Sequence, residues 1–272
     1  MILIVASTLD VAGINIAHQL IHHYGFEKAA TPVLGGPTYV REVRGCEVNL
    51  TLINRDAVDT QFITDLVKPE LLVFISRHSS ARGVPTLSVH TPGNLGPEAK
   101  FGGLPGKVSV SPASAMRDVL VEMTRQREAL NLPYEVCYEC THHGPSLDVP
   151  TFFAELGSTI EQWRDERAAE AVAHSVMAAI ARRSHYPAVL GVGGPHYNLK
   201  FTRMALEMPV AFGHIVPKYM LPKVGPEVIR QCVERTLEPV EAAVLDWKGI
   251  PGACKGWVVD TLRQLGVPVR KV

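Results

Sequence analysis

Histidine is the residue type in this sequence whose placement most strongly indicates chemistry. The chain has 11 histidines, and six of them lie at or just after short apolar runs that we predict as strands. These six are His78, His90, His142, His143, His196 and His214. Imidazole is the commonest metal ligand and the usual general base near neutral pH. Because ligands gather at the carboxyl ends of strands in a parallel sheet, we expect at least two of His78, His142, His196 and His214 in one active site.

Ligands that come from several separate loops are typical of a catalytic metal site rather than of a structural one. Adjacent residues tend to point apart, so we expect only one of His142 and His143 to bind an ion. The other would act as a base or hold the substrate. Backbone N–H groups at Gly193 and Gly194, or the Ser79 hydroxyl, would donate hydrogen bonds to an oxyanion. For the two glycines, the alternative is a tight turn with no catalytic role.

Other residues that could bind a metal or a base have weaker patterns. Cys137 and Cys140 are three positions apart, so in a strand they would point to opposite faces and could not share an ion. His18 and His22 lie four positions apart on a predicted helix, without the glutamate of an H-E-x-x-H motif. A solvated helix face is the better interpretation of that pair. Trp163 could stack on a base or ribose, although core packing is the more ordinary role.

The elements that must position these residues alternate between strands and helices. Short apolar runs predict strands at 2–6, 71–75, 86–89, 134–140 and 188–192. Amphipathic or capped segments predict helices at 11–24, 113–130, 227–237 and 252–265. A capping box from Ser158 to Glu161 predicts a long helix that continues to about residue 183. The alternation predicts a single α/β domain over 1–272, with a mostly parallel central sheet and helices on both faces.

Composition and charge exclude several classes of protein. Lys plus Arg and Asp plus Glu both number 27, so any contact with nucleic acid must come from a local patch. Residues 201–272 carry ten basic and seven acidic residues, and the candidate surface includes Lys218, Lys223 and Arg230. No apolar run reaches the roughly 18 residues of a membrane span, and five scattered cysteines indicate a reduced, cytoplasmic protein. The glycine fingerprint of dinucleotide sites and the phosphate-binding loop are both absent.

Seven motifs together resemble a known family. They are, in chain order, SRHSS at 76–80, HTPGN at 90–94, FGG at 101–103, THHGP at 141–145, ELGST at 155–159, GVGGPHY at 191–197 and FGH at 212–214. This set is similar to that of the archaeal and plant type of D-aminoacyl-tRNA deacylase, over residues 1 to about 250. The family usually has valine and then serine or threonine after the histidine of the second motif. This chain has Thr91 and Pro92 there, so that loop is expected to differ in shape.

The resemblance implies a zinc-dependent hydrolase that cleaves the ester between a D-amino acid and the 3′ end of tRNA, a chirality-proofreading step in translation. It also implies a fold similar to those of peptidyl-tRNA hydrolase and purine nucleoside phosphorylase. On position alone, the expected zinc ligands are His78, His142, His196 and His214. The expected substrate-binding residues are His90, Asn94, Trp163, Lys218 and Lys223. The expected partner is D-aminoacyl-tRNA, with no DNA and no membrane, and the expected state is a monomer.

Two other functions stay open. A nucleoside phosphorylase or hydrolase on the same fold would need a phosphate site with convergent arginines, such as Arg77 and Arg203. A tRNA- or metal-binding module without catalysis would have no need of so many histidines at strand ends. Phosphate-dependent cleavage of inosine would favour the first function, and tight RNA binding without turnover would favour the second.

Overall fold

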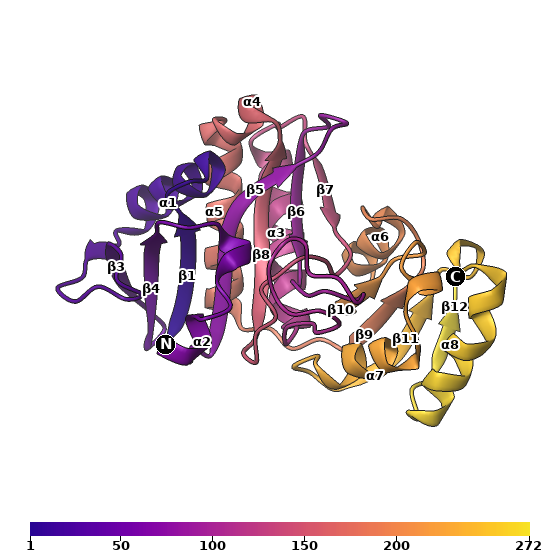
Figure 1. Cartoon of the computed structure of the whole chain (residues 1–272). Coiled ribbons are helices and arrows are strands. Elements are labelled where there is room, and N and C mark those ends of the chain that lie inside the picture. The colour runs from indigo at the N-terminus through magenta and orange to yellow at the C-terminus, as the bar shows by residue number, and fades with distance from the viewer.

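The computed structural model describes the whole chain, residues 1–272, and contains two sheets (Figure 1). The larger sheet has eight strands, which are β1 (Ile2–Ser7), β2 (Glu27–Lys28), β3 (Thr38–Val43), β4 (Cys46–Ile53), β5 (Leu71–Ser79), β6 (Thr86–His90), β7 (Glu135–Tyr138) and β8 (Thr151–Ser158). Their order across the sheet is β2-β3-β4-β1-β5-β8-β6-β7. Strands β4, β1, β5 and β8 run parallel, as the continuous apolar sequences of β1 and β5 lead one to expect.

Strand β6 runs in the opposite direction to its neighbour β8, and β7 pairs parallel with β6 at the edge of the sheet. Because β6 pairs antiparallel with β8, His90 lies opposite Phe153, near the start of β8. His78 lies within β5, opposite Gly157, near the end of β8. The carboxyl ends of β5 and β6 therefore do not share an edge. The expectation that the histidines meet along one edge of a parallel sheet is wrong.

The smaller sheet is entirely parallel. Its four strands are β9 (Ala188–Val192), β10 (Ala211–Val216), β11 (Val240–Leu245) and β12 (Val269–Lys271). Their order is β10-β9-β11-β12. In Figure 1 this sheet follows β7, toward the C-terminal end of the chain.

Helices cover both sheets. They are α1 (Val11–Tyr24), α2 (Ile63–Leu66), α3 (Ala113–Ala129), α4 (Ile160–Trp163), α5 (Glu166–Arg182), α6 (Leu199–Glu207), α7 (Pro226–Glu234) and α8 (Gly252–Gln264), with short 3-10 turns η1 (Ala57–Asp59), η2 (Leu221–Lys223) and η3 (Trp247–Gly249). None of them combines the length and the apolar content that crossing a bilayer requires.

The two faces of the larger sheet are covered differently. Ile4 packs with residues of α1, α3 and α5 in a core of 43 buried residues, which also includes Val189 of the smaller sheet. Leu3 points to the other face, where Ile63 of α2 and the loop residue Leu147 cover it. The remaining face of the smaller sheet packs against α7 and α8. The predicted α/β class with a mostly parallel sheet is confirmed, and the domain boundaries 1–272 stay a prediction.

The long helix predicted from residue 158 is divided into α4 and α5. Ser158 is still part of β8, and its hydroxyl donates to the carbonyl of Val84 at 2.6 Å, so it is not the helix cap. The capping box begins one residue later, with Thr159 as N-cap and Gln162 as its partner. Asp165 then caps α5 separately. The shift by one residue follows from the pairing of Ser158 in the sheet.

Candidate active site

The candidate active site lies where the two sheets meet. The loop after β7 pairs with residues of the smaller sheet and of the loop after β9. The N–H of Cys140 donates to the carbonyl of His196 at 2.9 Å, and the N–H of Thr141 donates to the carbonyl of Ile215 at 2.9 Å. These backbone bonds bring His142 beside His196, with ring centroids 4.4 Å apart. The site is therefore assembled by backbone hydrogen bonds between the two sheets. It is not assembled along the edge of one parallel sheet, as we expected.

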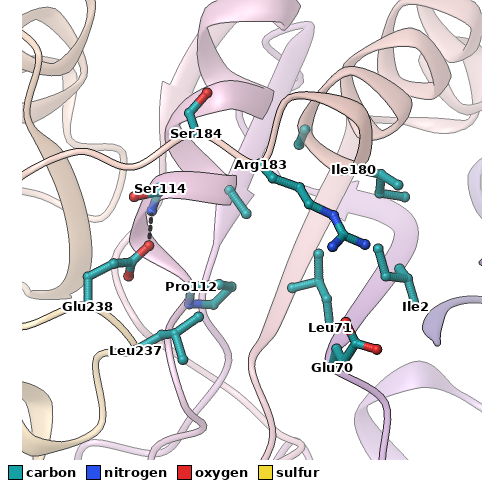
Figure 2. A pocket seen from close by; sticks show the side chains of 12 residues that line it. Ile2, Glu70, Leu71, Pro112, Ser114, Ile180, Arg183, Ser184, Leu237 and Glu238 are labelled. Carbon is teal, nitrogen blue, oxygen red and sulfur yellow. Dashed lines mark hydrogen bonds between the residues drawn. The ribbon is translucent and has the colours of Figure 1, made fainter. Parts of the chain in front are cut away.

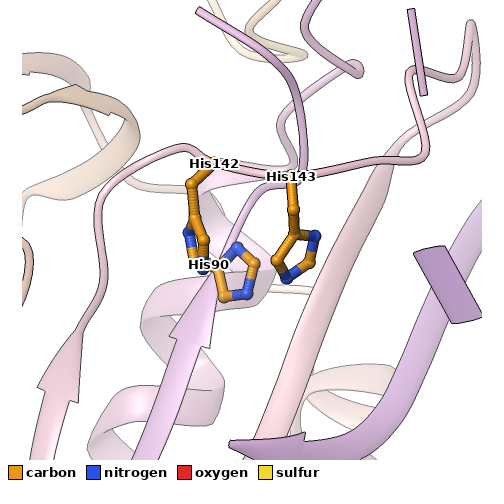
Figure 3. A group of neighbouring side chains, drawn as sticks. All are labelled: His90, His142 and His143. Carbon is orange, nitrogen blue, oxygen red and sulfur yellow. The ribbon is translucent and has the colours of Figure 1, made fainter. Parts of the chain in front are cut away.

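Three histidines at this junction face one shared position (Figure 3). His90 ends β6, and His142 and His143 lie in the loop after β7. Ring nitrogens of the three lie within 4.8 Å of one another. The ring centroids are 4.2 Å apart for His90 and His142, 4.8 Å for His90 and His143, and 4.4 Å for the adjacent pair.

The hydrogen bonds of this cluster fix the proton on the same nitrogen of each ring. Each Nδ1 faces a backbone carbonyl, which can only accept. The acceptors are Thr91 for His90 (3.3 Å), Cys140 for His142 (2.8 Å) and Gly144 for His143 (2.7 Å). Each Nδ1 must therefore carry the hydrogen, which leaves the Nε2 lone pair of a neutral ring free. Metal-bound histidines usually show this arrangement, since the outer N–H bond orients the ring.

The electrostatics of the cluster keep two of its rings, those of His142 and His143, neutral. Burial and the neighbouring histidines lower the pKa of His142 well below its usual value. Burial, with His90 next to it, lowers the pKa of His143 to about 4. The Nε2 atom of His90 is buried and has no hydrogen-bond partner. Two neutral imidazoles, together with the unsatisfied ring nitrogen of His90, fit a divalent metal ion.

The structure groups residues for which we expected different roles. Both His142 and His143 belong to the cluster, although we expected only one of them to bind an ion. The backbone of His143 is left-handed, with φ of +42°, and this turns its ring toward the same side as that of His142. His90, which we expected to bind substrate, is the third member.

Glu139 is a buried acceptor beside the cluster. Its Oε2 lies 2.8 Å from Nε2 of His196 and 3.8 Å from Nε2 of His142. Its Oε1 lies 3.2 Å from Nδ1 of His78. Burial disfavours the carboxylate, but the bonds from His196 and His78 outweigh it and hold the pKa of Glu139 well below its usual range. Glu139 is therefore ionised in the folded protein.

His78 lies between two carboxylates. Glu155, on β8, accepts from the Ser76 hydroxyl at 2.8 Å, and its other oxygen lies 3.6 Å from Nδ1 of His78. Burial opposes the charge on His78, but Glu139 and Glu155 raise the pKa of His78 to about 11. The other nitrogen, Nε2, contacts the Tyr197 hydroxyl at 3.0 Å. His78 thus supplies the positive charge of this group as an imidazolium.

His196 joins Glu139 to a buried thiol. Its Nδ1 lies 3.2 Å from Sγ of Cys140 and 3.0 Å from the hydroxyl of Tyr219. Burial opposes its charge, but Cys140 and Glu139 raise the pKa of His196 to about 10. Cys140, His142 and His196 form a second group of possible ligands, whereas Cys137 belongs to no such group.

A pocket of about 630 Å³ opens beside the histidines. It is lined by His142, His143 and His196 on one side and by the loop 93–101 on the other. Asn94 holds this loop together, since its amide donates to the carbonyls of Gly102 (2.8 Å) and Leu104 (3.3 Å). Of the residues predicted to bind substrate, Asn94 and Lys223 line the pocket, and Lys218 and Trp163 do not.

Several predicted residues have structural roles elsewhere. The N–H of Gly193 donates to the carbonyl of Val216 at 2.8 Å and is not free for an oxyanion. Gly193 and Gly194 have φ of +99° and +76°, as a tight turn requires. The oxyanion role of the Gly194 N–H stays a prediction. Ser79 is exposed and follows His78 in β5, so its side chain points to the opposite face. The indole of Trp163 donates to the carbonyl of His78 at 2.8 Å.

His214 is buried in β10, outside the groups of possible metal ligands. Its Nδ1 contacts the Thr141 hydroxyl at 3.0 Å, and its Nε2 faces the carbonyl of Arg235 at 3.3 Å. Both ring nitrogens already have partners, so the structure does not bring this predicted ligand to the site.

The residues that sequence reasoning missed are Glu139, Cys140, Tyr197 and Tyr219. The first two directly precede the THHGP motif. Their position was a usable signal, because residues that flank a histidine pair share its loop.

A change of pH should reveal the burial of His214. Burial lowers the pKa of His214 to about 4, from 6.5 in an unfolded chain. The folded state thus binds the proton less well, and stability present above pH 6.5 is lost as the pH falls toward 4. The loss from this one residue is roughly 3 kcal/mol. We expect His214→Gln to reduce the pH dependence of urea unfolding in this range. Equal slopes for the two proteins would contradict the assignment.

Gly144→Ala should disturb the pocket wall. A Cβ at Gly144 would lie 2.2 Å from the carbonyl carbon of Gly102 and from the nitrogen of Gly103. The segment that carries Phe101 must then move away from the histidines. We expect a loss of about 1–3 kcal/mol in urea unfolding and a lower turnover rate. Gly256→Ala is the control, since it has open space and a helical backbone.

A second pocket, of about 230 Å³, lies at the amino ends of β1 and β5 (Figure 2). Ile2, Leu71 and Glu238 are among its lining residues, and none of the predicted site residues is. The carboxylate of Glu238 accepts from the N–H groups of Ala113 (3.0 Å) and Ser114 (2.8 Å). The amino end of α3 is therefore already capped, and this pocket has no cluster of catalytic groups.

Comparison with known proteins shows which family the chain resembles. A family model described as D-aminoacyl-tRNA deacylase matches residues 66–270. Proteins named D-aminoacyl-tRNA deacylase from Pyrococcus furiosus and Thermococcus kodakarensis are 39% and 37% identical to this chain, and each alignment covers 97% of both proteins. The crystal structure of a conserved protein of unknown function is similar over 100% of this chain and 95% of its own, with a TM-score of 0.88 and 30% identity. The chain therefore belongs to the D-aminoacyl-tRNA deacylase family.

Proposed function

We propose that this protein hydrolyses the ester bond of D-aminoacyl-tRNA and releases the D-amino acid and tRNA. The observation that carries the proposal is the cluster of His90, His142 and His143, three imidazoles whose ring nitrogens lie within 4.8 Å of one another beside a pocket of about 630 Å³. Relatives that cover nearly the whole chain are named for this activity. Hydrolysis of an ester needs an activated water and a stabilised oxyanion, and the two can be supplied here by different parts of the site.

We propose that His90, His142 and His143 hold a zinc ion. Three imidazoles with a fourth position open to the pocket are a donor set typical of catalytic zinc. Bound zinc lowers the pKa of a water molecule to about 7 and polarises a carbonyl group. The hydrogen bonds from the three Nδ1 atoms to backbone carbonyls keep the rings oriented before any ion binds.

His196 is the residue best placed to act on the leaving group. It lines the pocket, and Glu139 keeps it protonated at neutral pH. An imidazolium there stabilises negative charge on the reacting ester. Its Nε2–H is held by Glu139, so the proton for the departing ribose oxygen would come from Nδ1 by way of the Tyr219 hydroxyl, which lies 3.0 Å from Nδ1 and lines the pocket. Glu139 holds the ring in place through the 2.8 Å bond to Nε2. Cys140 is fully buried and does not line the pocket, so it positions His196 and does not attack the substrate.

The test compares matched D- and L-aminoacyl-tRNAs, with and without a chelator. We expect rapid release of the D-amino acid, slow release of the L-form, and loss of activity with the chelator that added zinc restores. Equal rates on the two enantiomers would overturn the proposed substrate. Full activity in the chelator would overturn the zinc proposal while the hydrolase proposal stands.

Lys223 should contribute to tRNA binding more than Lys218 does, because only Lys223 lines the pocket. Each phosphate that a lysine neutralises on single-stranded RNA adds about 0.7 to the slope of log affinity against log salt. We expect Lys223→Ala to weaken binding and reduce that slope, and Lys218→Ala to have a smaller effect. Lys68→Ala, an exposed lysine outside the pocket, is the control. An unchanged slope for Lys223→Ala would show that this surface is wrong.

The alternative of a nucleoside phosphorylase lacks its expected phosphate site. Arg77 lies over the ring of Trp163 at 5.7 Å and 3.8 Å from Asp56. Arg203 is an exposed residue of α6. Neither arginine lines the pocket. Phosphate-dependent cleavage of inosine remains the assay that would support this alternative.

A further inference from the structure

We propose that His23, Glu170 and His174 form a second, peripheral site for a divalent transition metal ion such as zinc, which ties α1 to α5. This site goes beyond the proposed hydrolysis and does not depend on it. His23 lies in the last turn of α1, and Glu170 and His174 lie one turn apart on α5. None of the three belongs to the pocket or to the groups around Glu139.

The distances between the ligand atoms suit one ion. Oε1 of Glu170 lies 3.3 Å from Nε2 of His174 and 3.9 Å from Nε2 of His23. All three ligand atoms are within 4.8 Å of one another. An ion held tetrahedrally at about 2.1 Å from each atom would separate them by about 3.4 Å, so only small side-chain movements are needed.

Tyr24 prepares His174 for this role. The Tyr24 hydroxyl lies 2.6 Å from Nδ1 of His174, so this nitrogen already has a partner while Nε2 faces Glu170. Without an ion, the Glu170 carboxylate can only accept, so Nε2 carries the hydrogen and Nδ1 accepts from the tyrosine. When a metal binds Nε2, the hydrogen is carried by Nδ1 instead, which then donates to the tyrosine oxygen. A hydrogen bond of this kind to the outer nitrogen is the usual support of a metal-bound histidine.

The chemistry of the donors selects the occupant. Two imidazole nitrogens and one carboxylate oxygen suit zinc and its neighbours, whereas calcium and magnesium prefer oxygen ligands only. The side chains of His23, Glu170 and His174 are 31%, 27% and 25% exposed, so an ion and completing water molecules can reach them. An ion there would link residues that are nearly 150 positions apart. Because the ion would bind the folded chain and not the unfolded chain, it would stabilise the folded state.

The experiment measures zinc content and zinc-dependent thermal stability of the full chain at micromolar zinc. The proteins are wild type, the double variant His23→Ala with His174→Ala, the single variant Glu170→Gln, and the control His18→Ala. His18 is an exposed histidine on the same helix, outside the site. We expect the double variant to retain one zinc ion per chain fewer than wild type and to lose part of the rise in Tm with zinc. Glu170→Gln keeps the shape of the side chain and should weaken zinc binding at this site at least about tenfold.

Hydrolysis of D-aminoacyl-tRNA should be unchanged in all these variants, since none of the replaced residues reaches the pocket. If the double variant keeps the zinc content and the zinc-dependent Tm of wild type, the peripheral site is disproved. That result would leave the proposed function untouched, because the function is tested by activity in the chelator and by the variants of the pocket histidines. Loss of zinc from His18→Ala to the same extent would also disprove the site.

Discussion

His142→Ala is expected to lower the rate of D-aminoacyl-tRNA hydrolysis at least about a thousandfold and to reduce the zinc content of the purified protein. His142 belongs to two of the three groups of possible ligands at the junction and lines the pocket; the third group is His78, Glu139 and Glu155. A thousandfold loss corresponds to about 4 kcal/mol of transition-state stabilisation, which is of the size that a metal ion supplies. Single-turnover release of labelled D-amino acid and metal analysis of the same sample provide the measurement.

The control for this variant is His185→Ala, which replaces an exposed histidine outside the site. Its zinc content and rate should match those of wild type. The variants His90→Ala and His143→Ala should behave as His142→Ala does. His196→Ala should lose activity and keep zinc, because we propose that His196 supplies a proton and does not bind the ion. Full zinc in all three ligand variants would contradict the assignment of the metal site.

Glu139→Gln is expected to destabilise the folded protein by about 3–5 kcal/mol. The substitution keeps the volume of the side chain but removes the charge that faces His78 at 3.2 Å and His196 at 2.8 Å. Removing one partner of a buried ion pair leaves the other charge uncompensated. The resulting loss in the free energy of unfolding is far larger than the contribution of an exposed ion pair. Urea unfolding followed by circular dichroism measures the loss. Activity should fall as well, since His196 loses the acceptor that orients it.

Glu161→Gln provides the matched comparison, because Glu161 is exposed on α4. Its unfolding free energy should stay within about 0.5 kcal/mol of wild type. If Glu139→Gln shows an equally small change, then Glu139 does not bear a charge in the folded protein. In that case His78 and His196 would not be protonated either, because the charge on Glu139 is the reason for assigning them the imidazolium form.

The strands and long helices of this protein were largely predictable from the sequence, for a physical reason. β1, at Ile2–Ser7, is buried on both faces, and a strand of that kind must be apolar throughout. α1 begins where Asp10 caps it and ends at Gly25, in a left-handed conformation, as the sequence predicts. Local sequence carries this information because caps and burial act on neighbouring residues.

The direction of β6 was not predictable in this way. Its residues would be equally apolar in a parallel or an antiparallel strand, and the choice depends on pairing with β8, about 65 positions away. The geometry of the site depends on that choice. The histidines were identified as a group from their positions at the ends of predicted strands, but the assignment of ligands on that basis selected His214 and set aside His90 and one of the adjacent pair. Glu139 was overlooked because its role comes from contacts with His78 and His196, which are distant in the sequence.

Cys140 and Thr141 donate backbone hydrogen bonds to His196 and Ile215, across the junction of the two sheets. Local opening of these bonds should therefore affect catalysis. The three histidines proposed to hold zinc belong to the larger sheet and its loop, whereas His196 follows β9 of the smaller sheet. Any transient opening that separates the sheets therefore also separates these three histidines from His196. Such openings occur at a lower free energy than global unfolding. Amide hydrogen exchange at Cys140 and Thr141 should accordingly measure the fraction of molecules that are folded but inactive, while the amides of β1 stay protected.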